Sequence, residues 1–196
     1  GEGGLGIVEL GFQHSLQREV AIKTTKEHAK QNESNTLLFQ EGQIMGRLEH
    51  PNIIPVHVLG KGEDGRPLVV MKLVKGVTWS DLLANPEHEV WKSLTNYSQD
   101  KDWLMECNLE ILLKVCDALE YAHSEGIIHR DIKPDNIMVG SFGEVYLLDW
   151  GIALDKNKVT LANSEGGLLG TPCYMAPEML ACNPQLIDER TDVYLM

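Results

Sequence analysis

The segment HRDIKPDNIMV, residues 129–139, places an acid, two cations and an amide within a few positions of one another. Asp131 can accept or orient a hydroxyl proton as a general base. Lys133, two residues further along an extended loop, points the same way and can offset the charge of a phosphate. Asn136 supplies a hard oxygen suited to Mg²⁺. The ordered set favours a phosphate-handling site over an ordinary charged surface loop.

A second acid follows the strand-like run at the start of VYLLDWGIAL, residues 145–154. A carboxylate at the end of an apolar strand is costly to bury without a positive partner, so a cation is expected beside Asp149. The short strands NIMV and EVYLL flank GSFG, which predicts a β-hairpin before this acid. Gly151 would let the chain turn sharply after it.

The clearest helical pattern lies upstream, at residues 108–126, and Gly126 is a natural end for it. One stripe of this helix is predicted to be buried, and it comprises Leu109, Leu112, Leu113, Cys116, Leu119 and His123. Residues 85–103 before the helix are polar and are predicted to form a solvated insertion.

The N-terminal segment GEGGLGIV matches GxGxxG at Gly1, Gly3 and Gly6. In a dinucleotide-binding fold such glycines open a helix, but here the strand EVAIK, residues 19–23, comes next. The glycines therefore belong to a strand–turn–strand, where backbone N–H groups can approach phosphate oxygens closely. An ordinary hairpin turn is the alternative interpretation of this segment.

A further helix is predicted at residues 34–49, with Leu37, Ile44, Met45 and Leu48 on its apolar face. Glu41 lies on that same face and needs a cation. Lys23, at the end of strand 19–23, is the candidate, and such a pair could aim the ammonium group at phosphates. Another strand is predicted at residues 66–74. The order of elements suggests an α+β protein in two unequal lobes.

Taken together, these motifs resemble the signature set of the protein kinase superfamily, most closely the eukaryotic-like (Hanks-type) serine/threonine kinases of bacteria. GEGGLGIV is similar to the glycine-rich loop, VAIK ends in the family's lysine, and Glu41 falls at the helix-C glutamate. HRDIKPDN resembles the catalytic loop and DWG stands in for DFG. GTPCYMAPE, residues 170–178, ends in APE, and TDVY resembles the start of the next large helix, with Asp192 as its buried acid. The motifs follow in family order across essentially all 196 residues.

The resemblance implies an α+β, two-lobed protein kinase-like fold, with an antiparallel N-lobe sheet plus helix C and a mainly helical C-lobe. The N-lobe is expected at residues 1–74 and a partial C-lobe at 75–196, with 149–178 as the activation segment. The domain is expected to be incomplete at both ends, the C-lobe being truncated after the start of the large central helix. Glu178 of the APE motif is therefore expected to lack the arginine that pairs with it in the family.

The resemblance also implies ATP-dependent phosphoryl transfer to serine or threonine hydroxyls of protein substrates, with ATP and Mg²⁺ as cofactors. Asp131 would position the hydroxyl and take its proton, and Lys133 would touch the transferring phosphate. Asn136 and Asp149 would hold the metal. Arg130 would receive a phosphate on the activation loop, where Ser164 is the favoured phosphosite, and Thr171 would shape the substrate site.

The positions implied to bind ATP belong to the glycine-rich loop, the sheet beneath it and the segment after the gatekeeper. They are Gly1, Gly3, Gly6, Val8, Ala21, Lys23, Glu41, Met71, Lys72, Val74 and Met138. Met71 would be the gatekeeper, and Lys72 and Val74 would offer backbone groups to adenine. Lys23 would contact the α- and β-phosphates.

Trp150 departs from the family, which usually has phenylalanine after the metal-binding acid. The implied stack is Val56, Met45, Trp150 and His129. Because Met45 is flexible and Val56 is small, the larger indole is expected to fit in an active-competent arrangement.

Composition narrows the other possibilities. A net charge of −12 makes nucleic acid a poor partner, and no run of eighteen apolar residues is present to span a membrane. Cys107, Cys116, Cys173 and Cys182 have no metal-ligand spacing, which favours reduced thiols and a cytoplasmic location, including the cytoplasmic part of a membrane-anchored protein. One alternative is a pseudokinase or nucleotide-binding scaffold, which would normally lack Lys23, Asp131 or Asp149. Another is a small-molecule phosphotransferase, which does not usually combine KPDN with GTPxYMAPE.

Overall fold

The structure is a computed structural model that describes residues 6–26, 31–94, 102–158 and 169–196. The chain divides into two compact units. The first comprises Gly1–Glu49 and Ile54–Val74, and the second comprises His50–Ile53 and Lys75–Met196. Each unit is described by itself below.

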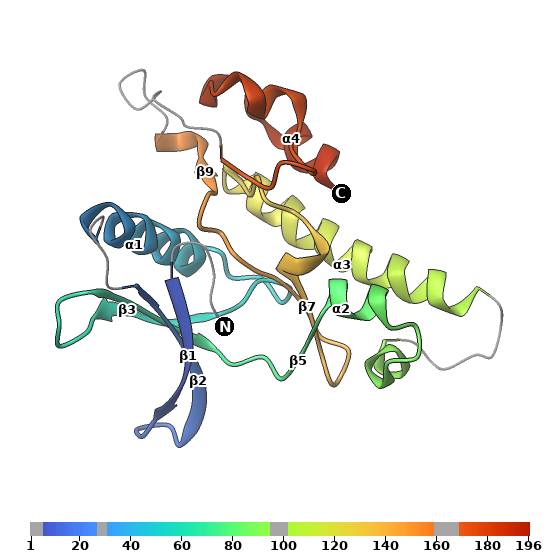
Figure 1. Cartoon of the computed structure of the whole chain (residues 1–196), viewed down its shortest axis with the longest axis horizontal. Coiled ribbons are helices and arrows are strands. Elements are labelled where there is room, and N and C mark those ends of the chain that lie inside the picture. Colours follow the sequence, from blue (N-terminus) through green and yellow to red (C-terminus); the bar gives the residue numbers. More distant parts are fainter. Residues whose placement is uncertain (1–5, 27–30, 95–101, 159–168) are drawn as a thin grey trace. The chain divides into compact units, whose positions relative to one another are not determined.

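An antiparallel sheet of four strands forms the first unit, in the order β1-β2-β4-β3 (Figure 1). The strands are β1 (Gly6–Gln13), β2 (Arg18–Thr25), β3 (Val56–Lys61) and β4 (Pro67–Lys72). The helix α1 (Gln31–Arg47) packs on β2, β3 and β4. Val69 of the sheet and Leu38 of the helix are buried, which is how one face of the sheet and the helix stripe share one core.

The predicted helix at residues 34–49 is confirmed, although it begins three residues earlier and ends two residues earlier. Ile44, Met45 and Leu48 are buried as predicted, with Leu48 just past the end of the helix. Glu41 is 4% exposed, so the acid does lie on the buried face.

In the second unit, short strands form two small sheets, β5 (Gly76–Thr78), β7 (Ile137–Gly140) and β8 (Val145–Leu147) in one, and β6 (Ile127–Ile128) with β9 (Leu154–Asp155) in the other. Its α-helices are α2 (Trp79–Ala84), α3 (Trp103–Ser124) and α4 (Glu189–Leu195). Single turns of 3-10 helix are η1 (Glu89–Ser93), η2 (Pro134–Asn136), η3 (Lys156–Lys158), η5 (Pro177–Ala181) and η6 (Pro184–Leu186). The hairpin predicted around GSFG is confirmed by the antiparallel β7–β8 pair.

The long helix α3 packs through a different face from the predicted one. Its buried residues are Cys107, Ile111, Val115, Ala118, Leu119 and Ala122. Leu109 and Leu113, predicted to be buried, are 49% and 60% exposed, and Cys116 is only partly buried. The helix carries apolar residues on two faces, and the face that contacts β6 and β8 is the one that becomes core. Gly126 ends the helix as predicted, with a φ of +75°.

The predicted solvated insertion at residues 85–103 is wrong for its first part. Trp91 and Leu94 are buried, and the indole N–H of Trp91 donates to the carbonyl of Asn85 at 3.1 Å. The buried thiol of Cys107 donates in turn to the carbonyl of Trp91. Val90 is buried as well, so three apolar residues anchor this polar stretch. Residues 95–101 lie outside the described part of the chain.

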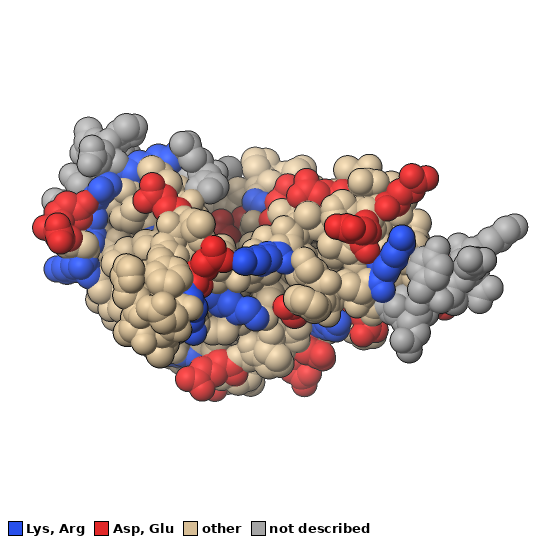
Figure 2. All heavy atoms as spheres, turned by 90° about the horizontal axis from the view of Figure 1, so that it is seen from below, with Lys and Arg blue, Asp and Glu red and all other residues tan. Residues whose placement is uncertain are grey.

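The surface carries both signs of charge. On the face that Figure 2 shows, acidic and basic side chains are interspersed, although the chain as a whole has a net charge of −12. Within the described ranges, no helix combines the length and apolar character needed to cross a bilayer.

Candidate active site

The predicted pair of Lys23 and Glu41 is present in the first unit. The ammonium Nζ of Lys23 on β2 lies 2.5 Å from Oε1 of Glu41 on α1. The side chains are 14% and 4% exposed, so a buried acid is matched by a largely buried cation. The ammonium group is thereby held at one place on the sheet face.

Four of the adenine- and phosphate-contacting candidates share that face of the sheet, namely Val8, Ala21, Lys23 and Met71. Lys23 pairs across the sheet with Val8, and Ala21 pairs with Met71, and directly opposed residues of an antiparallel pair point to the same side. Lys72 pairs with Val20 and so lies on the other face. Its N–H donates to the carbonyl of Pro55 at 3.1 Å.

In the second unit, the loop after β6 is held by the fully buried carboxylate of Asp192. Its Oδ2 accepts the N–H of His129 and its Oδ1 accepts the N–H of Arg130, both at 2.8 Å. Arg130 has a φ of +69°, a left-handed conformation that non-glycine residues adopt only when it is held in place. The next residue is Asp131.

The side chains predicted to act in transfer converge on the carboxylate of Asp131. The hydroxyl of Thr171 donates to Oδ1 at 2.7 Å, and Nζ of Lys133 donates to Oδ2 at 2.8 Å. The amide nitrogen of Asn136 donates to the same Oδ2 at 2.8 Å and to the backbone carbonyl of Asp131 at 2.7 Å. Lys133 also donates to the hydroxyl of Thr171 at 2.6 Å. Residues 40 positions apart are thereby joined in one polar cluster.

These contacts set the charge state of Asp131. Burial works to raise the pKa of this carboxyl, but the hydrogen bonds from Lys133, Thr171 and Asn136 outweigh burial, and the pKa lies below its ordinary value. The carboxylate is therefore ionised at neutral pH, as a group that accepts a proton must be.

The two predicted metal ligands are placed by the same loop and by the end of β8. The amide nitrogen of Asn136 is engaged by Asp131, which leaves its Oδ1 to face a cation. Asp149 has a φ of +58° and is exposed, so the expectation of a buried carboxylate is wrong. One amide and one carboxylate oxygen fit Mg²⁺, which takes its remaining ligands from phosphates and water. In the described part of the chain no cluster of three or more His, Cys, Asp or Glu side chains could hold a metal by itself.

Trp150 packs edge-on against His129, with ring centroids 4.6 Å apart. His129 donates from Nε2 to the carbonyl of Leu148 and accepts the N–H of Asp131 at Nδ1, which fixes the neutral tautomer. Burial lowers the pKa of His129 and favours that same form. This half of the predicted stack is confirmed, and Met45 and Val56 belong to the first unit, so the other half stays a prediction.

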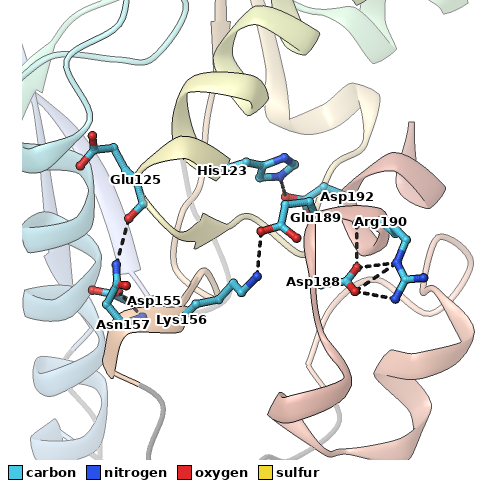
Figure 3. A network of polar contacts seen from close by, with 9 residues as sticks. All are labelled: His123, Glu125, Asp155, Lys156, Asn157, Asp188, Glu189, Arg190 and Asp192. Carbon is cyan, nitrogen blue, oxygen red and sulfur yellow. Dashed lines mark hydrogen bonds and ion pairs between the residues drawn. The ribbon is translucent and has the colours of Figure 1, made fainter.

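Several contacts of α4 were missed by the sequence reasoning (Figure 3). Lys156 on η3 forms an ion pair with Glu189 at 2.7 Å, and His123 on α3 contacts Asp192 at 2.7 Å. Thr191 donates to Glu178 at 2.6 Å, so the acid that was expected to lack the family's arginine accepts a hydrogen bond from a hydroxyl. The polar ring of His123 at the end of an apolar stripe was the available signal. Gly1, Gly3 and Ser164 lie outside the described residues.

The four-stranded sheet, the pairing of Lys23 with Glu41 and the polar cluster at Asp131 are features of a protein kinase. The comparison with known families agrees. The protein kinase domain family matches residues 1–196, and the chain belongs to that family.

Among curated proteins, the chain is similar to the serine/threonine-protein kinase PknD of Chlamydia caviae, at 36% identity over all of this chain and 22% of that protein. PknD of Chlamydia felis is also 36% identical, and PknD of Chlamydia pneumoniae is 35% identical, each over 100% of this chain and 22% of the relative. The chain thus spans about a fifth of the length of the curated relatives it matches.

Proposed function

We propose that this chain transfers the γ-phosphoryl group of ATP to serine or threonine hydroxyls of protein substrates. The observation that supports this proposal is the ionised carboxylate of Asp131, which accepts hydrogen bonds from Thr171, Lys133 and Asn136. A fixed carboxylate with a depressed pKa can orient a hydroxyl and accept its proton, while Lys133 beside it offsets phosphate charge.

Two groups would bind the nucleotide at its phosphates. Lys23, aimed by Glu41, would contact the α- and β-phosphates, and Oδ1 of Asn136 with the carboxylate of Asp149 would hold Mg²⁺. The metal would neutralise charge on the phosphates during transfer. The carbonyl of Lys72 and the backbone of Val74 would meet adenine, with Val8, Ala21 and Met138 against the base and Met71 as gatekeeper.

The preference for serine and threonine rests on the similarity to serine/threonine-protein kinases and on the contact of Lys133 with Thr171 at Asp131. The compartment we propose is the cytoplasm, where ATP is abundant and where thiols stay reduced, as all four described cysteines are.

The test is transfer of labelled γ-phosphate from Mg-ATP to generic protein substrates by the full-length protein, beside an Asp131→Asn variant. We expect transfer to serine and threonine that falls at least about a hundredfold in the variant, because proton acceptance and positioning are both lost. Nucleotide binding without any transfer would instead support a nucleotide-binding scaffold, the alternative function.

A second proposal for the same reaction concerns Arg130, because its guanidinium could pair with an anion. Burial lowers the pKa of Arg130 to about 10, and its Nε donates to the carbonyl of Ile152 at 2.6 Å. We propose that a phosphate on Ser164 pairs with this cation. Mass spectrometry after incubation with Mg-ATP should find the phosphate on residues 159–168, and a phosphate found only elsewhere would contradict the proposal.

A further inference from the structure

Side chains join the helix α1 and the strand β2 of the first unit (Figure 1) at two places. One is the ion pair of Lys23 with Glu41 described above. The other is a hydrogen bond of 2.7 Å from the hydroxyl of Thr25, the last residue of β2, to Oδ1 of Asn35 on α1. Thr25 is fully buried, and a buried hydroxyl is costly without a hydrogen bond. Nothing in the proposed transfer chemistry uses Thr25 or Asn35.

The two attachments are separated along both elements. Lys23 and Thr25 are two residues apart on β2, so their side chains lie on the same face of the sheet, roughly 7 Å apart along the strand. Asn35 and Glu41 are six residues apart on α1, about 9 Å along the helix axis. A helix held by one contact can pivot about it, whereas two contacts at this separation fix the direction of the helix.

The backbone at Thr25 is held from the side of β4. Continuing the register of β2 and β4 by one pair past Thr24 and Leu68 sets Thr25 opposite Pro67, which has no N–H to donate. Arg66 supplies a donor at this position, because its Nη1 donates to the carbonyl of Thr25 at 2.7 Å. The end of β2 therefore depends on a side chain where a sheet normally uses backbone.

Arg66 is itself kept in place by Asp64. Its Nε donates to Oδ2 of Asp64 at 2.6 Å, and its backbone N–H donates to Oδ1 at 2.9 Å. The side chain of Arg66 is 18% exposed and that of Asp64 is 48% exposed. The loop between β3 and β4 thus connects the protein surface with the buried end of β2, and it sets where Thr25 presents its hydroxyl to Asn35.

We infer that the hydrogen bond between Thr25 and Asn35 positions α1 so that Glu41 stays against Lys23, and that Arg66 supports this bond by holding the carbonyl of Thr25. All three are positioning residues, because none of them touches ATP in the proposed scheme. The inference rests on the proposed function for its effect on transfer, since small displacements of a phosphate-contacting group cost large factors in rate. Its effect on α1 can be measured without any activity.

Matched variants separate the hydrogen bond from packing. Thr25→Val keeps the shape of the buried side chain and removes the hydroxyl, whereas Thr25→Ser keeps the hydroxyl. Thr24→Val is the control on the neighbouring residue, because the hydroxyl of Thr24 donates to the carbonyl of Pro67 on β4 at 3.2 Å. Asn35→Ala removes the acceptor from the helix, and it takes the place of Thr25→Val if that variant does not fold. Arg66→Met keeps the aliphatic stem and removes the donors.

The first measurement is amide hydrogen exchange along α1 in the full-length protein without nucleotide. We expect exchange to rise about three- to tenfold in Thr25→Val and Arg66→Met, the order expected for loss of one hydrogen bond, and to stay near wild type in Thr25→Ser and Thr24→Val. Once Asn35→Ala has removed the acceptor, adding Thr25→Val should change exchange by less than about twofold.

Three results of the exchange experiment would overturn the inference. Unchanged exchange in Thr25→Val would mean that the bond does not hold α1, and an equal rise in Thr24→Val would mean that any lost hydroxyl loosens the sheet. Wild-type exchange in Arg66→Met would remove Arg66 from the inference.

The second measurement is steady-state kinetics with Mg-ATP and a protein substrate. We expect kcat/KM for ATP to fall about three- to tenfold in Thr25→Val, with KM for the protein substrate within about twofold of wild type, and Thr25→Ser to recover most of the loss. Wild-type transfer by Thr25→Val, or a serine variant as slow as the valine variant, would overturn the positioning role. If the wild-type protein transfers no phosphate while the exchange pattern holds, the proposed function fails and the second attachment of α1 stands.

Discussion

At the scale of single residues, Trp150 combines good packing with an unsatisfied donor. The side chain is 0% exposed, and its Nε1 is buried without a hydrogen-bond partner among the described residues. A buried unpaired donor costs about 1–3 kcal/mol, while trimming indole to phenyl loses packing of comparable size. Trp150→Phe is therefore expected to change the free energy of unfolding by less than about 1.5 kcal/mol and to retain transfer activity.

Trp150→Ala is the matched comparison, because it removes the ring contact with His129 as well as the donor. It should cost about 3–5 kcal/mol in denaturant unfolding. Phosphoryl transfer lost in the phenylalanine variant, with its fold intact, would show that the indole has a role beyond packing.

Thr171 is a residue whose importance can be tested through pH. Its hydroxyl donates to Asp131, and hydrogen bonds of this kind hold the pKa of that carboxyl below its ordinary value despite burial. Thr171→Val removes one donor, so the pKa of Asp131 should rise, and the acid limb of the kcat/KM profile should move to higher pH. Thr171→Ser keeps the hydroxyl and should leave the limb in place.

The lowered pKa of Asp131 also makes the stability of the folded protein depend on pH. A carboxyl whose pKa is lower in the folded state contributes stability above its ordinary pKa, near 3.9, and loses that contribution as pH falls through the folded value. Thr171→Val should therefore flatten the acid side of the stability curve in denaturant unfolding at a series of pH values. An acid limb and a stability curve that both match wild type would contradict the contact seen here.

The sequence predicted single residues well where a local oddity was visible. Glu41 stood out as an acid on an apolar helix face, and the structure confirms its pairing with Lys23. The bond between Thr191 and Glu178 could not be found in this way. Both are ordinary polar residues in ordinary local patterns, and only the packing of α4 brings them together.

At the scale of elements, α3 offers two apolar faces and buries one of them. Leu109 is 49% exposed, whereas Ile111 is 0% exposed in the face that contacts β6 and β8. Leu109→Lys is expected to change the free energy of unfolding by no more than about 0.5 kcal/mol, because an exposed helix position tolerates lysine well. Ile111→Ala should cost about 2–5 kcal/mol.

The free energies of unfolding of the two α3 variants should be compared by thermal or denaturant unfolding under the same conditions. A loss in Leu109→Lys as large as that in Ile111→Ala would mean that the predicted stripe, and not the observed face, is buried in the protein in solution.

The same helix shows why element packing escapes sequence reasoning. A period of 3.6 identifies apolar faces, but it does not say which of two faces meets the sheet. The prediction for the segment around Trp91 was wrong for a related reason, because polar neighbours concealed three buried apolar residues, Val90, Trp91 and Leu94. The elements predicted at residues 19–23, 34–49, 66–74 and 108–126 follow from local pattern and are confirmed, as is the hairpin between β7 and β8. The strand β3 and the helix α2 were not predicted.

At the scale of the whole molecule, the chain crosses between its two units more than once. Residues His50–Ile53 belong to the second unit although the chain on both sides belongs to the first. Asn52 explains this, because its side-chain amide donates to the carbonyl of Val145 and its carbonyl accepts the N–H of Leu147. Ile53 extends that contact as a parallel bridge to Leu147. A short apolar segment flanked by polar residues gives no local sign of such a role.

The net charge of −12 acts on every charged partner of the chain, whatever its binding site. Peptides that share one acceptor segment and differ only in remote lysine, glutamine or glutamate residues should therefore differ in kcat/KM at low salt, with lysine highest. Raising ionic strength from about 0.01 M to about 0.15 M shortens the Debye length from about 30 Å to about 8 Å, so the lysine peptide should lose several-fold while the glutamine peptide stays nearly constant. An identical salt response of all three peptides would show that local contacts at the acceptor site outweigh the field of the whole chain.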